Sequence, residues 1–221
     1  MSKTVFIIHT NRLAGNDLTR LFNEMAPEIA VRNIIDDSML PEVLASGGVT
    51  PEVLRRYCTY AIQAEESGAD LIFNQCSSVG EAAEVARAMV RVPIVKIDER
   101  MAEVACRSGS RIGVVATASS TMGPTTRLLQ KTAGRLGVEV SLVEELRTDA
   151  FERMMAGDKQ GHNSLLLETI RNLFQKVDVV VCAQGSMIAL APDLGDTPIP
   201  VLMSPPIGVA HAVEVLRSIE R

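Results

Sequence analysis

Cys76 is the residue whose type and position most clearly predict chemistry in this chain. It follows the apolar run 70–74, which predicts a strand, and it precedes Ser77 and Ser78, which predict the start of a helix. At a helix start, unpaired backbone N–H groups and the helix dipole favour a thiolate, the reactive form of cysteine. The alternative is a small residue packed at a strand end, as most free cysteines are. Position alone leaves both interpretations open.

The other three cysteines stand alone, without a Cys-x-x-Cys pair. Cys58 and Cys106 lie in amphipathic helical stretches, so we expect both to pack in the core. Cys182 lies two residues before Gln184 on the same strand face, where it could line the floor of a site, although its apolar neighbours at 179–181 favour packing. This spacing predicts neither a structural zinc site nor a disulfide scaffold. We therefore expect no bound metal.

A second candidate site is the hydroxyl-rich segment 117–121, which follows the strand-like run 111–116. Thr117, Ser120 and Thr121 would place hydroxyl and backbone N–H groups at the start of a helix. Such a position is favourable for a carboxylate or a phosphate. The alternative is a helix cap that binds no ligand.

Thr10 and Asn11 follow the first strand-like run and could present a second set of polar groups to the same ligand. His9 precedes them, and a lone histidine at a strand end is more often a hydrogen-bonded structural residue than a base. We expect structural or solvated roles for His162, in a polar loop, and for His211, in a C-terminal helix. The chain has no G-x-G-x-x-G after a strand, no Walker sequence and no G-x-S-x-G elbow, so nucleotide cofactors and serine hydrolysis lack support.

Strand-like and helical segments alternate along the chain, which predicts an α/β fold with a largely parallel sheet. The nearly continuous apolar cores suit strands that helices cover on both faces. The strand-like runs are 5–9, 29–35, 70–74, 92–97, 111–116, 138–143, 178–182 and 199–203. Helical periodicity is clearest at 51–67, 78–90, 122–136, 162–176 and 205–219. Thr50 and Ser204, each followed by proline, predict helix N-caps.

The chain resembles itself at an offset of about 107 residues. Three blocks of the first half align, in the same order, with blocks of the second half: 5–10 with 112–117, 69–78 with 177–186, and 92–95 with 199–202. This repeat predicts two duplicated α/β halves, residues 1–98 with 204–221 and residues 99–203. In open α/β sheets, ligands bind beyond the carboxyl ends of the strands, so two halves facing one another would enclose a cleft. The loops expected to line it are 9–11, 75–78, 117–121 and 183–186.

Composition restricts the partners that this chain can have. Its 221 residues include 22 Lys and Arg against 27 Asp and Glu, a net charge of −5, and 3% aromatic side chains. Without basic runs or aromatic stacking platforms, it lacks the features of a nucleic-acid binder. No window approaches the roughly 18 consecutive apolar residues of a membrane span. We expect a cytoplasmic protein that binds neither nucleic acid nor a membrane.

These segments resemble a known family, the cofactor-independent aspartate/glutamate racemase superfamily, which includes hydantoin racemases, maleate isomerases and arylmalonate decarboxylases. The resemblance covers nearly the whole chain and rests on the duplicated architecture, on 70–78 around Cys76, and on 111–117. The block 178–187 is similar to the family's second Gly-Cys-Thr motif. The resemblance implies two pseudo-symmetric, flavodoxin-like halves with the active site in the cleft between them. It also implies a small carboxylate substrate and a dimer or higher homo-oligomer.

The resemblance assigns the catalytic role to Cys76, and the alignment places Gln184 at the position of the family's second catalytic cysteine. Racemisation next to a carboxylate needs a base on one face of the carbon and an acid on the other. A glutamine side chain does not titrate and can supply neither, which leaves Cys182 as the alternative second thiol. One thiol still suffices for a single proton donation or for nucleophilic addition. The residues expected to hold the substrate are Thr10, Asn11, Ser77, Ser78, Thr117, Ser120, Thr121, Gly185 and Ser186.

We therefore expect a metal-free and cofactor-free racemase or isomerase that acts on a small carboxylate or a similar carbonyl acid. One alternative is a one-cysteine decarboxylase or lyase of the same superfamily, and another is a non-catalytic homologue that binds a carboxylate. A different class is a flavodoxin-like protein that holds the phosphate of FMN at 117–121. The few aromatic side chains available to contact a flavin argue against that class.

Overall fold

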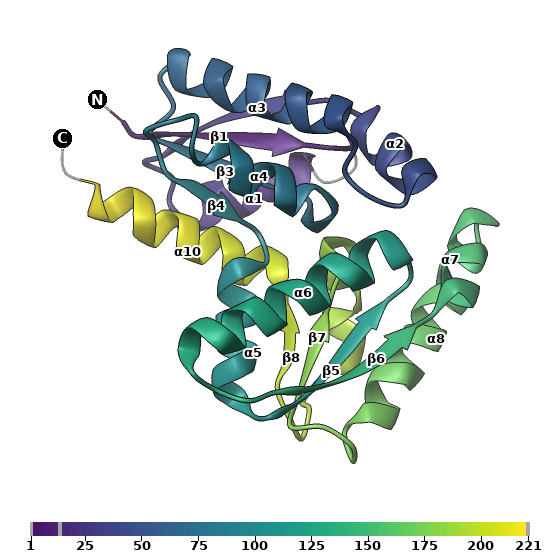
Figure 1. Ribbon diagram of the computed structural model, residues 1–221. Coiled ribbons are helices and arrows are strands. Elements are labelled where there is room, and N and C mark those ends of the chain that lie inside the picture. The colour runs from purple at the N-terminus through teal and green to yellow at the C-terminus, as the bar shows by residue number, and fades with distance from the viewer. Residues whose placement is uncertain (1, 13–14, 220–221) are drawn as a thin grey trace. The chain divides into compact units, whose positions relative to one another are not determined.

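The computed structural model describes residues 2–12 and 15–219. The chain divides into two compact units, Met1–Ile97 together with Pro205–Arg221, and Asp98–Ser204 (Figure 1). The second unit is therefore inserted into the sequence of the first, whose last helix follows it. Within the described residues, no helix combines the length and the apolar character needed to cross a membrane.

The first unit is built on a four-stranded parallel sheet with the strand order β2-β1-β3-β4. The strands are β1 Thr4–His9, β2 Ala30–Ile35, β3 Leu71–Asn74 and β4 Ile94–Lys96. The helices are α1 Gly15–Met25, α2 Met39–Ser46, α3 Pro51–Glu66, the 3-10 helix η1 Ser77–Val79, α4 Gly80–Ala86 and α10 Ser204–Ser218. Because the strands are parallel, their carboxyl ends share one edge of the sheet.

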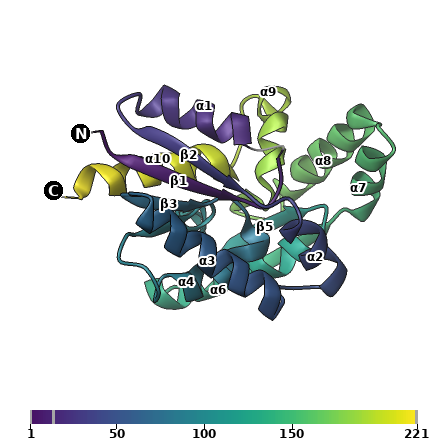
Figure 2. The ribbon, with the colours of Figure 1, turned by 90° about the horizontal axis from the view of Figure 1, so that it is seen from above.

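Helices cover both faces of this first sheet (Figure 2). Along β1 the side chains alternate: Ile8 packs in a core with α2, α3 and α4, whereas Val5 and Ile7 pack in a core with α1 and α10. Phe22 of α1 meets Phe73 of β3 edge to face, with ring centroids 5.4 Å apart. Burial of both faces explains why the central strands are almost wholly apolar.

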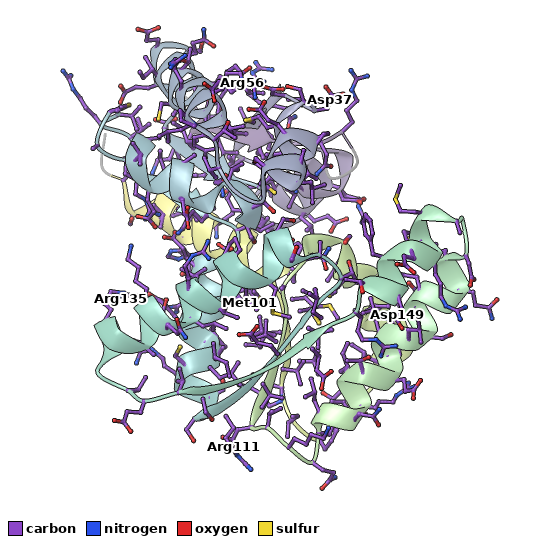
Figure 3. All side chains as sticks on the ribbon, turned by 45° about the vertical axis from the view of Figure 1, so that its right-hand side comes forward. Asp37, Arg56, Met101, Arg111, Arg135 and Asp149 are labelled. Carbon is purple, nitrogen blue, oxygen red and sulfur yellow. The ribbon has the colours of Figure 1, made fainter. Side chains whose placement is uncertain are left out.

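The second unit repeats this plan with the strand order β6-β5-β7-β8, again parallel. The strands are β5 Arg111–Ala116, β6 Ser141–Leu146, β7 Val179–Cys182 and β8 Val201–Met203. The helices are α5 Glu99–Ser108, α6 Ser119–Leu136, α7 Thr148–Met155, α8 Lys159–Leu173, the 3-10 helix η2 Gly185–Leu190 and α9 Ala191–Leu194. Val115 and Val180 pack against α8, and Met101 of α5 is buried in the interior of this unit (Figure 3).

An aspartate joins the amino ends of the two central strands in each unit. In the first unit, the Asp70 carboxylate accepts a hydrogen bond from the backbone N–H of Thr4 at 2.7 Å. In the second, Asp178 accepts hydrogen bonds from the backbone N–H groups of Ser110 and Arg111 at 3.1 and 2.8 Å. The guanidinium of Arg111, labelled in Figure 3, lies 2.7 Å from the same carboxylate and lowers the pKa of Asp178. The two units thus share a strand order and a stabilising contact.

The expectation of an α/β fold with two parallel sheets is confirmed, but some local expectations are wrong. The helix expected at 78–90 is replaced by η1 and a shorter α4, which ends at Ala86. The sixth strand begins at Ser141, three residues later than expected, and α6 ends before it with Gly137 in a left-handed conformation. Ser204 is the first residue of α10 rather than its cap. Thr50 does cap α3, since its hydroxyl accepts the N–H of Val53 at 3.2 Å.

Gly208 allows α10 to approach the end of β4 closely. A β carbon at Gly208 would lie 2.9 Å from the Cα atom of Ile97 and closer still to its carbonyl oxygen. We expect Gly208→Ala to lower the free energy of unfolding by about 1–3 kcal/mol, because backbone atoms would have to move. The control is Gly134→Ala in α6, where nothing lies within 4 Å of the added carbon and a gain of up to about 1 kcal/mol is expected. Urea denaturation of both variants checks this, and equal stability of the two would contradict it.

Candidate functional site

In both sheets the strand order reverses between the two central strands, β1 and β3 in the first unit and β5 and β7 in the second. Such a reversal is where ligands bind in open α/β sheets, at the carboxyl ends of the strands. The loops that begin there in the first unit start with Thr10 and with Gln75 followed by Cys76. In the second unit they start with Thr117 and with Ala183 followed by Gln184. The sequence-predicted site residues therefore lie on these two edges.

Cys76 stands directly before η1, with an extended backbone (φ −120°, ψ 122°). Its carbonyl oxygen accepts two hydrogen bonds, from the Asn74 side-chain amide at 3.0 Å and from the backbone N–H of Val79 at 3.2 Å. These two bonds fix the turn that carries the thiol. The thiol itself is half-buried, at the margin of the core formed with α3 and α4.

The other three cysteines are all buried. Burial raises the pKa values of the Cys58 and Cys106 thiols, and it raises the pKa of Cys182 to about 12. Cys182 lies in the apolar core beneath α8, a placement that favours packing over a catalytic role. Among the described residues, no group of three or more His, Cys, Asp or Glu side chains is placed to hold a metal ion.

Four buried polar atoms at the carboxyl edge of the first sheet have no hydrogen-bond partner among the residues that the structure describes. They are Nδ1 of His9, Oγ1 of Thr10, Oδ1 of Asn74 and Oε1 of Gln75. Leaving such an atom unpaired costs about 1–3 kcal/mol, so the four atoms make this edge of the sheet a candidate place for a ligand. Thr10 and the loop that begins with Gln75 were expected here from the sequence, whereas Asn74 was not assigned a role. The sequence feature that marks both amides is the change from apolar to amide side chains where β3 ends.

His9 is fully buried, and its Nε2 atom lies 2.7 Å from Oδ1 of Asn33. Because the amide nitrogen of Asn33 faces Thr19 Oγ1 at 3.4 Å, the oxygen of Asn33 is the atom that faces the imidazole. We infer that Nε2 carries the proton and that Nδ1 is an acceptor. Burial lowers the pKa of His9, which the bond to Asn33 only partly offsets. His9 is thus hydrogen-bonded within the structure, as we expected from the sequence. Its lowered pKa keeps the imidazole neutral near pH 7.

The lowered pKa of His9 predicts a loss of stability in acid. Below about pH 6.5 the unfolded chain binds a proton on His9 that the folded protein does not, so the free energy of unfolding falls as pH falls toward the folded-state pKa. The slope for this single group is at most about 1.4 kcal/mol per pH unit. Urea denaturation from pH 7.5 to 5 should show a smaller decrease for His9→Gln than for the wild type. Parallel curves for the two proteins would contradict this.

Gln184 occupies in the second unit the place that Cys76 has in the first. It stands directly before η2 with nearly the same backbone conformation (φ −113°, ψ 132°). Its side-chain oxygen Oε1 accepts hydrogen bonds from the backbone N–H of Thr117 at 2.7 Å and from the hydroxyl of Thr117 at 3.0 Å. Thr117 is buried, and Gln184 is half-buried. The donors expected to form an anion site at Thr117 are therefore already engaged by Gln184.

The remaining predicted residues lie on the same two edges. In the first unit, Ser77 and Ser78 are buried in η1 and Asn11 is half-buried after β1. In the second unit, Thr121 is buried and Ser120 half-buried in the first turn of α6, while Gly185 is half-buried and Ser186 exposed at the start of η2. That both sets line one cleft stays a prediction.

His162 lies in α8, not in a loop as expected, and its Nδ1 atom is 2.9 Å from the carbonyl oxygen of Ala150.

Lys96 is a buried charged residue near this edge that the sequence did not single out. It ends β4 in register with Asn74, and only 5% of it is exposed. Its ammonium lies 2.6 Å from the carboxylate of Glu84 in α4. This ion pair ties β4 to the helix that follows Cys76. The sequence feature that could have identified Lys96 is the presence of a lysine within the otherwise apolar strand-like run 92–97.

Comparison with known proteins places the chain in a family. The family model described as Asp/Glu/Hydantoin racemase matches residues 5–212. A search of the curated proteins found no matching sequence.

Three solved structures illustrate the fold. An aspartate racemase of Picrophilus torridus is 15% identical, with 99% of this chain and 96% of that chain covered and a TM-score of 0.72. A glutamate racemase of Thermus thermophilus, in complex with β-chloro-D-alanine, is 14% identical over 98% of this chain and 81% of that chain, with a TM-score of 0.71. An allantoin racemase of Klebsiella pneumoniae is 17% identical over 98% and 88%, with a TM-score of 0.64. These three similarities concern the fold alone. Because the family model covers nearly the whole chain, the protein belongs to the Asp/Glu/hydantoin racemase family.

Proposed function

We propose that this protein is a cofactor-independent enzyme that uses the Cys76 thiol to move a proton at a carbon next to a carboxylate or carbonyl group. The observation that carries the proposal is the position of Cys76. Cys76 is the one half-buried cysteine of the four, and it lies at a reversal of strand order. The same edge of the sheet carries four buried polar atoms that have no partner among the described residues. Membership of the racemase family supports the same chemistry.

In the proposed reaction the thiolate of Cys76 removes a proton from the substrate carbon, so that an S–H bond forms as the C–H bond breaks. The electron pair of the C–H bond moves into the adjoining carbonyl or carboxylate, whose oxygen gains negative charge. Hydroxyl groups of Thr10, Ser77 and Ser78 and the amide of Asn11 would donate hydrogen bonds to the carboxylate oxygens. Such donors stabilise the developing charge most when they are fixed in advance.

The acceptor atoms at this edge suggest which substrates suit the site. The amide nitrogen of Asn74 is held by the carbonyl oxygen of Cys76, so its free atom Oδ1 is an acceptor. Nδ1 of His9 is a second acceptor, and Oε1 of Gln75 is a third. Acceptors pair with N–H donors, which favours an amino acid with its ammonium group or a cyclic ureide with ring N–H groups. Aspartate, glutamate and allantoin, the substrates that the names of the similar structures give, all carry such donors.

A second candidate is a lyase or decarboxylase that uses a single thiol, and one observation favours it. Gln184 holds the position equivalent to Cys76 in the second unit, and Cys182 is buried in that unit's core. With one reactive thiol, proton delivery from one face of the carbon is sufficient for reprotonation after loss of CO2. Two-thiol racemisation would need a second acid from elsewhere.

The proposal is tested with a defined set of substrates. Both enantiomers of aspartate, glutamate, hydantoins and allantoin, together with substituted malonates, are incubated with the protein in D2O, and proton NMR follows the α-hydrogen. We expect exchange, isomerisation or CO2 release for at least one class. A purified wild-type protein that causes none of these with any member of the set would contradict the proposal.

A further inference from the structure

Lys96 is a buried charged side chain to which the proposed reaction gives no role. Only 5% of Lys96 is exposed, and its ammonium lies 2.6 Å from a carboxylate oxygen of Glu84. A β carbon placed on Gly80, the first residue of α4, would lie 3.7 Å from Cδ of Lys96. Gly80 and Glu84 are four positions apart, so they lie on the same face of the helix. The lysine side chain therefore lies along the first turn of α4, with its apolar stem beside Gly80.

Asn74 contacts the other end of the short segment 76–80. It pairs in register with Lys96 on the neighbouring strand, so the two side chains lie on the same face of the sheet. The amide of Asn74 donates a hydrogen bond to the carbonyl oxygen of Cys76 at 3.0 Å. The same oxygen accepts the backbone N–H of Val79 at 3.2 Å, which closes the turn that leads to Gly80. Two neighbouring side chains of the sheet thus contact the first and the last residue of this segment.

The second unit shows that the repeated fold does not require a polar pair at this place. Its strand order matches that of the first unit, and the register pair equivalent to Asn74 and Lys96 is Cys182 and Met203. Both of these side chains are buried in an apolar core. Replacing a buried ion pair with packed apolar side chains is often neutral or stabilising. Stability alone therefore does not account for a buried lysine at the end of β4.

We infer that Lys96 is a positioning residue for the reactive thiol: through Glu84 and Gly80 it fixes the start of α4, and with it the turn that carries Cys76. This inference rests on the proposed function for its consequence in catalysis. All of its residues belong to the first unit. Lys96 itself moves no proton, since it acts on the place of the thiol and not on the substrate.

The experiment compares variants of the ion pair with a matched control. Lys96→Met removes the ammonium, keeps an unbranched stem, and introduces the residue type of Met203 in the second unit. Lys96→Arg keeps a positive charge for Glu84, and Glu84→Ala breaks the ion pair from its more exposed side. The control is Arg87→Met. Arg87 also joins α4 to β4, because its guanidinium donates two hydrogen bonds to the carbonyl oxygen of Ile94, at 3.1 and 2.7 Å, at the opposite end of β4 from Lys96.

We expect Lys96→Met and Glu84→Ala to lower kcat about 10–100-fold, with KM changed less than kcat, because a misplacement of about 1 Å can cost about 100-fold in rate. Lys96→Arg should recover most of this loss, and Arg87→Met should match the wild type. Circular dichroism at the assay temperature identifies the folded variants. If the folded ion-pair variants keep kcat within about 3-fold of wild type, or if Arg87→Met loses as much as they do, the inference is overturned while the role of Cys76 stands.

A second readout does not depend on turnover. In ¹⁵N-labelled protein without substrate, NMR measures hydrogen exchange at the backbone N–H of Val79, which closes the turn after Cys76, relative to the amides of β1. Exchange reports local opening, and it should be at least about 10-fold faster in Lys96→Met but unchanged in Arg87→Met. Unchanged exchange in Lys96→Met would overturn the inference. Faster exchange in this variant, when the wild-type protein turns over no substrate, would support the positioning by Lys96 and contradict the proposed function.

Discussion

Cys76→Ala is expected to lower kcat at least about 100-fold toward any substrate that the wild-type protein turns over, because one positioned acid or base contributes about 10²–10⁴-fold to a rate. The fold should survive, since the thiol is half-buried and the turn that carries it is held through the carbonyl oxygen of the same residue. Steady-state kinetics with circular dichroism and thermal melting check both statements.

The matched control for this substitution is Cys58→Ala. Cys58 is buried in the apolar core within α3, so its variant should lose stability but keep kcat within a few-fold of wild type. A folded Cys76→Ala protein that keeps more than a tenth of the wild-type kcat would remove Cys76 from the mechanism. Equal losses in both variants would indicate an effect of general destabilisation.

The second large effect concerns stereochemistry. In D2O, a reaction that creates a stereocentre should give predominantly one enantiomer with one deuterium on the new C–H bond, because Cys76 delivers the proton from one face. Chiral chromatography with mass spectrometry measures the enantiomer ratio and the deuterium content together. A racemic product formed directly by the wild-type protein would mean that Cys182 or another group supplies a second proton.

Gln184→Cys extends this prediction. If this position faces the reacting carbon, as its alignment with the family's second cysteine implies, a thiol here should deliver protons to the opposite face, and the enantiomer ratio should move toward equality. The ratio, not the rate, is the measured quantity. A folded Gln184→Cys protein whose product stays as pure as that of the wild type would mean that this position does not face the reacting carbon.

The sequence was sufficient to predict the parallel strands and the loops that follow them. The patterns responsible are strong: β5 and β7 are nearly continuous apolar runs, and the repeat at an offset of about 107 residues aligned Gln184 with Cys76. The two residues do have the same backbone conformation before a 3-10 helix. Periodicity sets which residues are buried, and the carboxyl ends of the strands then locate the edge where polar residues gather.

The side-chain contacts within that edge were not predictable from the sequence. The bond from Thr117 to Gln184 joins residues that are 67 positions apart, and its formation depends on the rotamers of both. It reverses the expected role of Thr117, whose donors serve Gln184 rather than an anion. The loop 75–78 was expected at the site, but the burial of the side-chain oxygens of Asn74 and Gln75 was not predictable, because an amide at the end of a strand is equally compatible with an exposed turn.

The most direct test of the central claim, that Cys76 contacts the substrate, is its rate of alkylation by iodoacetamide with and without a saturating substrate, followed by peptide mapping. Without substrate, Cys76 should react faster than Cys58, Cys106 and Cys182, which are buried and whose pKa values burial raises. With substrate, labelling of Cys76 should fall at least about 10-fold while the other three stay unchanged. Labelling of Cys76 at the same rate in the presence of saturating substrate would contradict the account.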